Sequence, residues 1–263
     1  DGTHTVTVTG SFPSGQAPIL FKYAVPSPSR FAQILLVEAL RELGIKVSME
    51  PGRLPAEKSR NSCYAVENTV AEHVSPPLKE EVKVTLKVSQ NLHASATPFI
   101  MGALLGKRNE RNGFDVEHDF LARAGLDLSG AAQSDGAGGA AYFTPEFMVS
   151  FLAYMYKQKN YEDFLKALPI LGRDGTLWNI QPKSPAAGHV FAKTGTFAEG
   201  DLLNKRTIVT GKGLAGYLTT SDGGHLAFAI YVNKVSVPED PDAITRIAGQ
   251  ALGEIAAAAY EGM

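Results

Sequence analysis

The sequence predicts an α+β protein in which helices cover an antiparallel sheet, preceded by a small separate unit. Stretches with helical periodicity fill the middle of the chain. Two β-rich runs joined by a hairpin turn follow, and an Ala-rich helix closes the chain. An apolar content of 44% and a charged content of 20% over 263 residues are typical of a globular protein with a sizeable core.

Composition excludes several classes of function. The net charge is −2 and no basic stripe is present, so we expect no nucleic-acid partner. The single cysteine, Cys63, cannot form a disulfide within the chain. No run of eighteen apolar residues is present, so we expect no transmembrane segment. The chain starts at Asp1 without a signal peptide, which indicates a mature or trimmed product.

The first sixty residues predict a small subdomain. Residues 3–9 and 19–25 are β-prone, and each run is stopped by Pro or Gly. A helix follows, capped by Ser27 or Ser29 and ended at Gly44, and residues 45–49 return to a strand.

Residues 51–61 are rich in Pro, Gly and charge and are the best candidate for a boundary. We therefore predict a small subdomain over 1–60 and a larger domain over 61–263. Ser75-Pro76-Pro77 is a second stop, after which apolar spacing predicts a helix over 78–88.

The sequence of the larger domain predicts helices first and then a sheet. Pro98 lies within an apolar stretch, 97–105, that predicts a helix, and Thr144-Pro145 opens a strong one. The remaining predicted elements are a helix over 115–124, a glycine-rich loop over 134–139, a helix over 161–168, a turn over 174–177, strands through 193–195, 214–220 and 225–233, and a terminal helix over 243–260.

Two short motifs carry the chemistry. Lys193-Thr194-Gly195 follows a β-prone run, with glycine where a side chain would block a ligand lying against the strand. Ser89-Gln90-Asn91 lies about a hundred residues upstream, at the end of a predicted helix. Ser-x-x-Lys, Ser-Asp-Asn and Lys-Thr-Gly form one set in penicillin-binding proteins and class A β-lactamases. Two of the three are present here, in the same order.

These motifs suit acyl transfer by a serine, which needs an activated hydroxyl, a group that takes its proton and donors for the oxyanion. Ser89 would relay a proton between lysines and the leaving amine, and Asn91 would hold the substrate amide. Lys193 would be the cation on the carboxylate side. The strand from Thr194 to Thr196 would pair with the substrate backbone.

Three segments, 87–94, 174–177 and 192–196, together resemble the D-alanyl-D-alanine carboxypeptidase/endopeptidase family of low-molecular-mass class C penicillin-binding proteins. Residues 71–78 resemble the lead-in to its second motif. The resemblance implies a transpeptidase/β-lactamase-like fold with inserted domains, of which residues 1–60 would be the remainder. It also implies a periplasmic location. It also implies serine-type cleavage of peptidoglycan peptides ending in D-Ala-D-Ala, acylation by β-lactams, and no metal or cofactor.

By the same resemblance, Ser89, Asn91 and Lys193 are catalytic, and Thr194, Gly195, Thr196, Asp135 and Gly136 bind substrate. No serine of the chain has a lysine three positions later, so we expect the nucleophile upstream of this chain and expect the chain alone to be inactive. The loop at 135–140 also lacks the Ser-Gly-Leu-Ser-Arg-like run of the family.

Two other functions fit the same motifs. A noncatalytic peptidoglycan-binding or scaffolding module would keep the fold and lack the serine. A β-lactamase or esterase of the same fold would share the triplets, although the apparent inserted subdomain argues against it.

Overall fold

A computed structural model describes residues 5, 7–11, 14, 24–48, 66–105, 112–240 and 242–262. The chain divides into two compact units, Asp1–His73 and Val74–Met263. The predicted boundary after residue 60 falls outside the described residues, so the division at that point stays a prediction. All the predicted site residues belong to the second unit. No described helix has the length and apolar character needed to cross a membrane.

The first unit contains the predicted helix, α1 (Pro28–Glu42), with Ser27 as its N-cap residue. Gly44 ends it in the left-handed region at φ +78°, and its N–H donates to the Arg41 carbonyl at 2.9 Å. A short 3₁₀ turn, η1 (Val66–Asn68), is the second element described in this unit.

The strands predicted in this unit are not confirmed. The described parts of 3–9 and 45–49 belong to no strand, so those two predictions are wrong there, and residues 19–23 lie outside the described residues. β-branched residues favour a strand only where a neighbouring strand supplies hydrogen bonds and packing, and no such partner is found for them among the described residues.

The second unit begins with the predicted helices. They are α3 (Leu78–Val88), α4 (Asn91–Leu105), α5 (Gly113–Arg123), α6 (Pro145–Tyr156) and α7 (Tyr161–Ala167). α4 starts at Asn91 and not at the predicted residue 97. Their ends follow local signals: α3 starts directly after Pro77, and the Thr144 hydroxyl accepts the Phe147 N–H at the start of α6. Two short strands, β1 (Ala131–Gln133) and β2 (Ala141–Phe143), pair antiparallel around the predicted glycine-rich loop.

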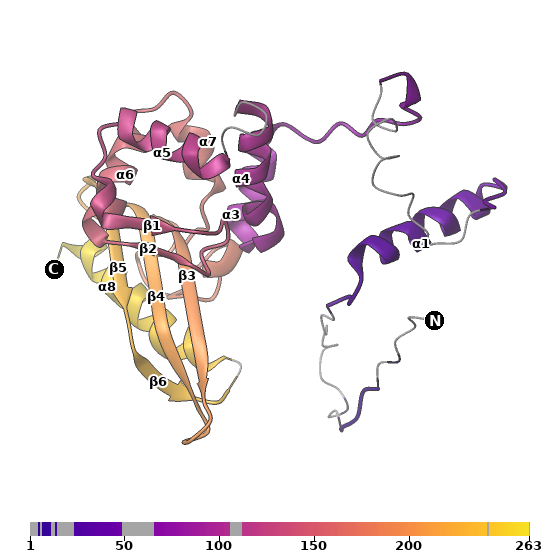
Figure 1. The fold of residues 1–263 in the computed structure, drawn as a ribbon. Coiled ribbons are helices and arrows are strands. Elements are labelled where there is room, and N and C mark those ends of the chain that lie inside the picture. Colours follow the sequence, from indigo (N-terminus) through magenta and orange to yellow (C-terminus); the bar gives the residue numbers. More distant parts are fainter. Residues whose placement is uncertain are drawn as a thin grey trace. The chain divides into compact units, whose positions relative to one another are not determined.

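The main sheet is antiparallel and has the order β3-β4-β5 (Figure 1). Its strands are β3 (Val190–Asp201), β4 (Arg206–Thr219), β5 (His225–Val232) and β6 (Val235–Pro238), and β6 pairs with the first part of β4. The predicted hairpin of β4 and β5 is confirmed. β4 starts at Arg206, earlier than predicted, because residues 206–213 lack a clear alternation of apolar side chains. β6 was not predicted, and it forms by pairing with that first part of β4.

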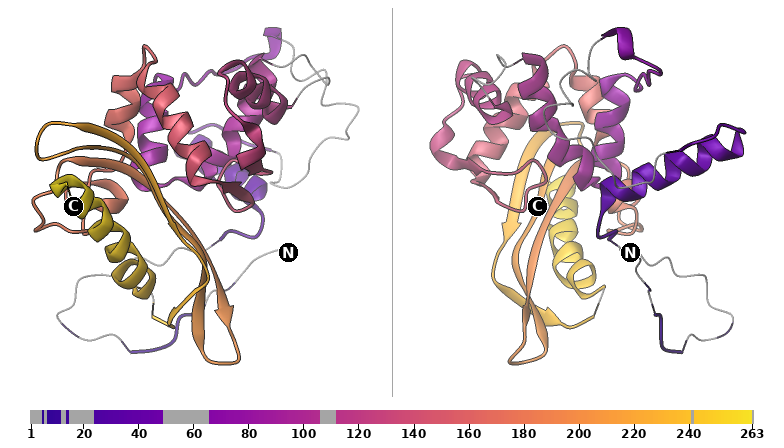
Figure 2. Two further views of the ribbon diagram at one scale, coloured as in Figure 1. Left: turned by 90° about the vertical axis from the view of Figure 1, so that its left-hand side faces the viewer. Right: turned by 45° about the vertical axis from the view of Figure 1, so that its right-hand side comes forward.

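Both faces of the sheet are covered. Leu214 and Leu218 pack on Leu252 of α8 (Gln250–Glu261), which continues a π-helical turn, η4 (Thr245–Gly249). Figure 2 shows α8 lying along one face. On the other face Tyr217 packs among residues of α6 and α7, and its hydroxyl donates to the Leu152 carbonyl at 2.8 Å. Neighbouring residues of β4 therefore face opposite layers, as the alternation of a strand requires.

Candidate active site

The end of α3 meets the middle of β3, and this brings the two predicted motifs together. The Lys193 ammonium donates to the Ser89 hydroxyl at 2.9 Å and to the Thr194 carbonyl at 2.7 Å. The two side chains are 104 positions apart in the sequence. The junction therefore contains a hydroxyl in direct contact with a cation, an arrangement able to move a proton.

Ser89 is held in an unusual backbone conformation. It caps α3 in the left-handed region at φ 57° and ψ 54°, and its N–H donates to the Thr85 carbonyl. A residue with a Cβ reaches this region at a cost of about 1 kcal/mol or more. The conformation lets α4 begin two residues later and leaves Ser89 exposed at the junction of the two helices.

The other two residues of the triplet have different tasks. The Gln90 side-chain oxygen accepts the Leu92 N–H at 3.1 Å, so Gln90 satisfies the first turn of α4. Asn91 is exposed, and its side chain has no hydrogen-bond partner among the described residues. The amide of Asn91 is therefore free to bind a ligand.

The electrostatics of Lys193 differ from those of an ordinary surface lysine. Burial, and secondly the nearby charge of Lys212, lower the pKa of Lys193 to about 8. Lys193 has no carboxylate partner among the described residues. It is mostly protonated at neutral pH, yet it can lose its proton far more easily than a free lysine.

The outer edge of β3 can pair with an extended chain. On the side away from β4, the Ala192 N–H donates to the Pro169 carbonyl and the Val190 carbonyl accepts the Leu171 N–H. Backbone groups alternate along a strand, so those of Thr194 and Thr196 face the same way. Their N–H groups have no described partner on this side.

Gly195 keeps the surface of this strand clear. A Cβ built at Gly195 would meet no heavy atom within 4 Å, so packing within the protein does not require glycine there. Gly216 on β4 is the opposite case, because a Cβ there would lie 2.0 Å from the Phe191 carbonyl oxygen. The open space at Gly195 fits the prediction that glycine makes room for a ligand.

A partly buried ion pair fixes α3 against β3, and the sequence did not predict this contact. The Lys87 ammonium donates to both carboxylate oxygens of Asp174, at 2.8 and 2.6 Å, and to the Leu168 carbonyl at 2.6 Å. Asp174 also accepts the Ile170 N–H at 2.8 Å, and Ile170 bridges to Phe191 of β3. The pair therefore sets the spacing between Ser89 and Lys193.

The turn after Asp174 continues this contact. Gly175 opens η3 (Gly175–Leu177) at φ +57°, and a Cβ there would lie 2.7 Å from the Lys87 carbonyl oxygen. Only glycine allows this conformation so close to α3. The next residue, Thr176, places its hydroxyl 3.4 Å from that of Thr194, a weak hydrogen bond.

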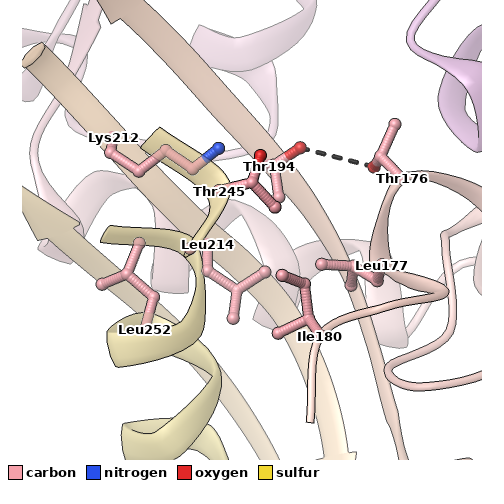
Figure 3. A pocket seen from close by; sticks show the side chains of 9 residues that line it. Thr176, Leu177, Ile180, Thr194, Lys212, Leu214, Thr245 and Leu252 are labelled. Atoms are coloured by element: carbon pink, nitrogen blue, oxygen red, sulfur yellow. Dashed lines mark hydrogen bonds between the residues drawn. The ribbon is translucent and has the colours of Figure 1, made fainter. Parts of the chain in front are cut away.

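A buried lysine lies on β4 beside β3 (Figure 3), and the sequence did not predict it either. Lys212 of β4 is directly opposite Thr196 and donates to its hydroxyl at 2.7 Å. Burial lowers the pKa of Lys212. The register of two strands places it there, and that register was not readable because β4 was predicted to start at residue 214.

The β1–β2 loop is shaped by Asp135. Its carboxylate accepts the N–H groups of Ala140, Ala137, Gly138 and Gly139, and these bonds hold the pKa of Asp135 below its usual range. The carboxylate is therefore largely occupied by its own loop.

The same loop lies against α4. A Cβ at Gly136 would lie 2.2 Å from the Ala94 carbonyl oxygen, so the backbone approaches the helix that begins at Asn91. Direct contact of Asp135 and Gly136 with a substrate stays a prediction. Among the described residues, no group of three or more His, Cys, Asp or Glu side chains is placed to hold a metal ion.

The fold is that of penicillin-binding protein 4 and of β-lactamases. Penicillin-binding protein 4 of Haemophilus influenzae superposes with a TM-score of 0.64 at 23% identity, over 90% of this chain and 50% of that one. The TLA-3 extended-spectrum β-lactamase superposes with a TM-score of 0.52 at 17% identity, over 88% and 81%. The predicted fold class is therefore confirmed.

The sequence profile of the D-Ala-D-Ala carboxypeptidase 3 (S13) family matches residues 1–252, and the chain belongs to this family. A D-alanyl-D-alanine carboxypeptidase of Actinomadura sp. (strain R39) is 29% identical over 247 residues, which are 90% of this chain and 43% of the relative. The D-alanyl-D-alanine carboxypeptidase DacB of Haemophilus influenzae is 26% identical over 237 residues, 87% and 45% respectively. The chain thus spans less than half the length of these relatives.

Proposed function

We propose that this chain carries the second and third motifs of a serine-type D-Ala-D-Ala carboxypeptidase/endopeptidase that acts on peptidoglycan stem peptides in the periplasm. The observation that carries the proposal is the 2.9 Å contact between the Lys193 ammonium and the Ser89 hydroxyl beside the open edge of β3. Family membership and the names of its relatives support the substrate class.

The substrate would lie as an added strand along β3. The N–H groups of Thr194 and Thr196 face outward and can pair with a peptide backbone, while Gly195 leaves the surface clear. Asn91 would hold a substrate amide with its unpartnered side chain. The Asp135 loop, packed on α4 through Gly136, would border the site and limit the room for the stem peptide.

The chemistry would proceed through an acyl-enzyme. A serine oxygen attacks the carbonyl carbon of the penultimate D-Ala, the C–N bond breaks, and the departing D-Ala amine gains a proton. Ser89 passes that proton, and the lowered pKa of Lys193 lets the ammonium exchange protons with Ser89. Water then hydrolyses the ester and releases the shortened peptide.

We propose that the nucleophilic serine and its lysine base come from residues other than these 263. No Ser-x-x-Lys occurs in the chain, and the two relatives are more than twice the length that it matches. β-Lactams, which imitate D-Ala-D-Ala, would occupy the same edge of β3.

The absence of a Ser-x-x-Lys motif from these 263 residues also favours a second candidate. This candidate is a noncatalytic module that binds peptidoglycan peptides along β3. Intact-protein mass spectrometry with excess benzylpenicillin separates the candidates. We expect no covalent adduct on the 263-residue chain, and an adduct on a longer natural chain that carries Ser-x-x-Lys. A longer chain without that motif and without an adduct would favour the binding module. An adduct on the 263 residues would place the nucleophile among them and contradict the proposal.

A further inference from the structure

The hairpin that joins β3 to β4 ends in a loop whose residues differ from those of ordinary exposed turns. Asp201 pairs with Arg206 at the ends of the two strands, and residues 202–205 form the loop between them. Gly, Pro, Asn, Asp and Ser are the usual residues of such turns. This loop instead begins with Leu202 and Leu203, which are 93% and 90% exposed. A departure of this kind from local rules is expected at functional positions.

Hydrogen bonds within the loop keep the two leucines exposed in one arrangement. The Asp201 carboxylate accepts the backbone N–H of Asn204 at 3.1 Å and its side-chain amide at 2.9 Å. The same carboxylate pairs with the Arg206 guanidinium at 3.2 Å. The turn is therefore closed by polar groups and does not need to bury its leucines. Because the loop is already ordered, a partner that covers the leucines loses little affinity to ordering them.

Lys205 adds a charge to this loop. Its backbone has φ 51°, in the left-handed region that favours glycine. Lys205 is exposed and forms no ion pair with any described carboxylate, whereas Arg206 is paired with Asp201. Residues 202–205 thus carry one positive charge and no negative one, and the exposed Glu199 lies farther back on β3. A lysine kept in a strained backbone conformation indicates a use for its side chain.

The hairpin carries this loop away from the candidate active site. Figures 1 and 2 show β3 and β4 extending past the end of α8, on the side away from α3 to α7. Nine positions separate Lys193 from Leu202, which is about 30 Å along an extended strand. A projecting tip at that distance can touch a surface while the outer edge of β3 near Thr194 stays open.

The surface of a lipid bilayer fits this tip better than a protein does. A stable protein–protein interface buries about 800 Å² on each partner, far more than two leucine side chains provide. A bilayer accepts a small apolar tip at the boundary between its headgroups and acyl chains, and anionic headgroups attract a nearby lysine. The long apolar stem of a lysine also lets its ammonium reach the headgroups while neighbouring side chains lie deeper.

We propose that Leu202, Leu203 and Lys205 form a membrane-contact site for the surface of an anionic bilayer. The two leucines enter the boundary between headgroups and acyl chains, and the Lys205 ammonium binds a lipid phosphate. The contact is peripheral and reversible, because it involves two apolar side chains and one charge. It does not depend on the proposed function, since none of the three residues belongs to the candidate active site.

The test measures binding of the 263-residue chain to vesicles of phosphatidylglycerol and phosphatidylcholine in equal parts, by co-sedimentation. We expect L202S/L203S to lower the partition coefficient by about tenfold or more, because two leucines no longer leave water. K205Q should lower it by about fivefold on these vesicles and leave binding to pure phosphatidylcholine unchanged. L104S removes a leucine of α4 that is 77% exposed and is the matched control, which should bind like the wild type.

A second measurement locates the contact on the chain. A lipid with a nitroxide on its acyl chain should broaden the amide resonances of Leu202 and Leu203 in the wild type, and leave those of Thr194 to Thr196 unchanged. Urea denaturation should show the same stability for L202S/L203S as for the wild type, because both leucines are exposed.

Several results would overturn the proposal. They are a wild type that does not bind the vesicles, an L202S/L203S variant that binds as tightly as the wild type, and broadening that spares Leu202 and Leu203. Sedimentation without lipid tests the other occupant. A wild-type dimer that L202S/L203S converts to a monomer would assign the loop to a second copy of this chain and not to a bilayer.

Discussion

Lys87 and Lys193 lie within one junction, yet they are bound in opposite ways. All the donors of Lys87 are satisfied by Asp174 and a backbone carbonyl, so its charge is neutralised and its position fixed. Lys193 faces a hydroxyl and a carbonyl without a described carboxylate, and its pKa falls to about 8. The difference shows how a structural lysine can be distinguished from a lysine that is available to a ligand. The structural lysine is paired with a carboxylate, and the available one is not.

Among substitutions that remove a side chain, the largest expected effect comes from the structural lysine, Lys87. K87M should lower the free energy of unfolding by about 2 kcal/mol, because the partly buried Asp174 carboxylate and the Leu168 carbonyl lose their hydrogen-bond donor. Urea denaturation measures the loss. K83M, on an exposed position of the same helix, is the matched control and should change stability by less than about 0.5 kcal/mol. Equal unfolding free energies for K87M and K83M would contradict the structural role of Lys87.

Elements that depend on neighbouring residues were predicted from the sequence, and elements that depend on distant residues were not. The starts of α3 and α6 depend on prolines and a threonine cap next to them in the sequence, and both were predicted. The first half of β4, and β6, depend on pairing with distant strands, and both were missed. In the described parts of 3–9 and 45–49 the predicted strands were wrong for the same reason, because a local β propensity does not form a strand without a pairing partner.

The site residues also differ in whether a local sequence pattern indicates them. The motifs led to Ser89 and Lys193, and the structure places them in contact. The ion pair of Lys87 with Asp174 joins residues 87 positions apart, and no local pattern indicates it. Lys212 was missed because its place opposite Thr196 depends on strand register.

A second prediction concerns the backbone of Ser89. S89G should be more stable than S89A by about 1 kcal/mol, because glycine adopts φ 57° without the penalty that alanine retains. Both variants lose the hydroxyl, so the comparison isolates the backbone. Chemical denaturation of the two chains measures it, and an alanine variant as stable as the glycine variant would mean that the conformation costs nothing.

A third prediction follows from the titration of Lys193. The pKa of Lys193 is lowered in the fold, so the folded chain releases this proton before the unfolded chain does. Stability contributed by this group therefore rises as pH increases from about 8 toward the ordinary lysine value of about 10.5. NMR of the side-chain ammonium should give a midpoint near 8, and K212M should raise it by removing a like charge. A midpoint that stays near 10.5 in the wild type would contradict this.

The smallest expected effect on stability is that of G195A. The new Cβ meets no atom within 4 Å, so the unfolding free energy should change by less than about 0.5 kcal/mol, while peptide binding weakens. G216A is its counterpart: its Cβ would collide with the Phe191 carbonyl and should destabilise the sheet by about 2 kcal/mol or more. Thermal unfolding of both variants, with calorimetry of G195A, separates a glycine kept for a ligand from one required by packing.

The most direct test of the site is an NMR titration of the 263-residue chain with diacetyl-L-lysyl-D-alanyl-D-alanine. We predict amide shifts confined to Ser89, Asn91 and the strand from Thr194 to Thr196, and none with the L-alanyl-L-alanine isomer. Shifts elsewhere in the chain, or equal shifts with both isomers, would contradict the assignment of this junction as the peptide-binding site.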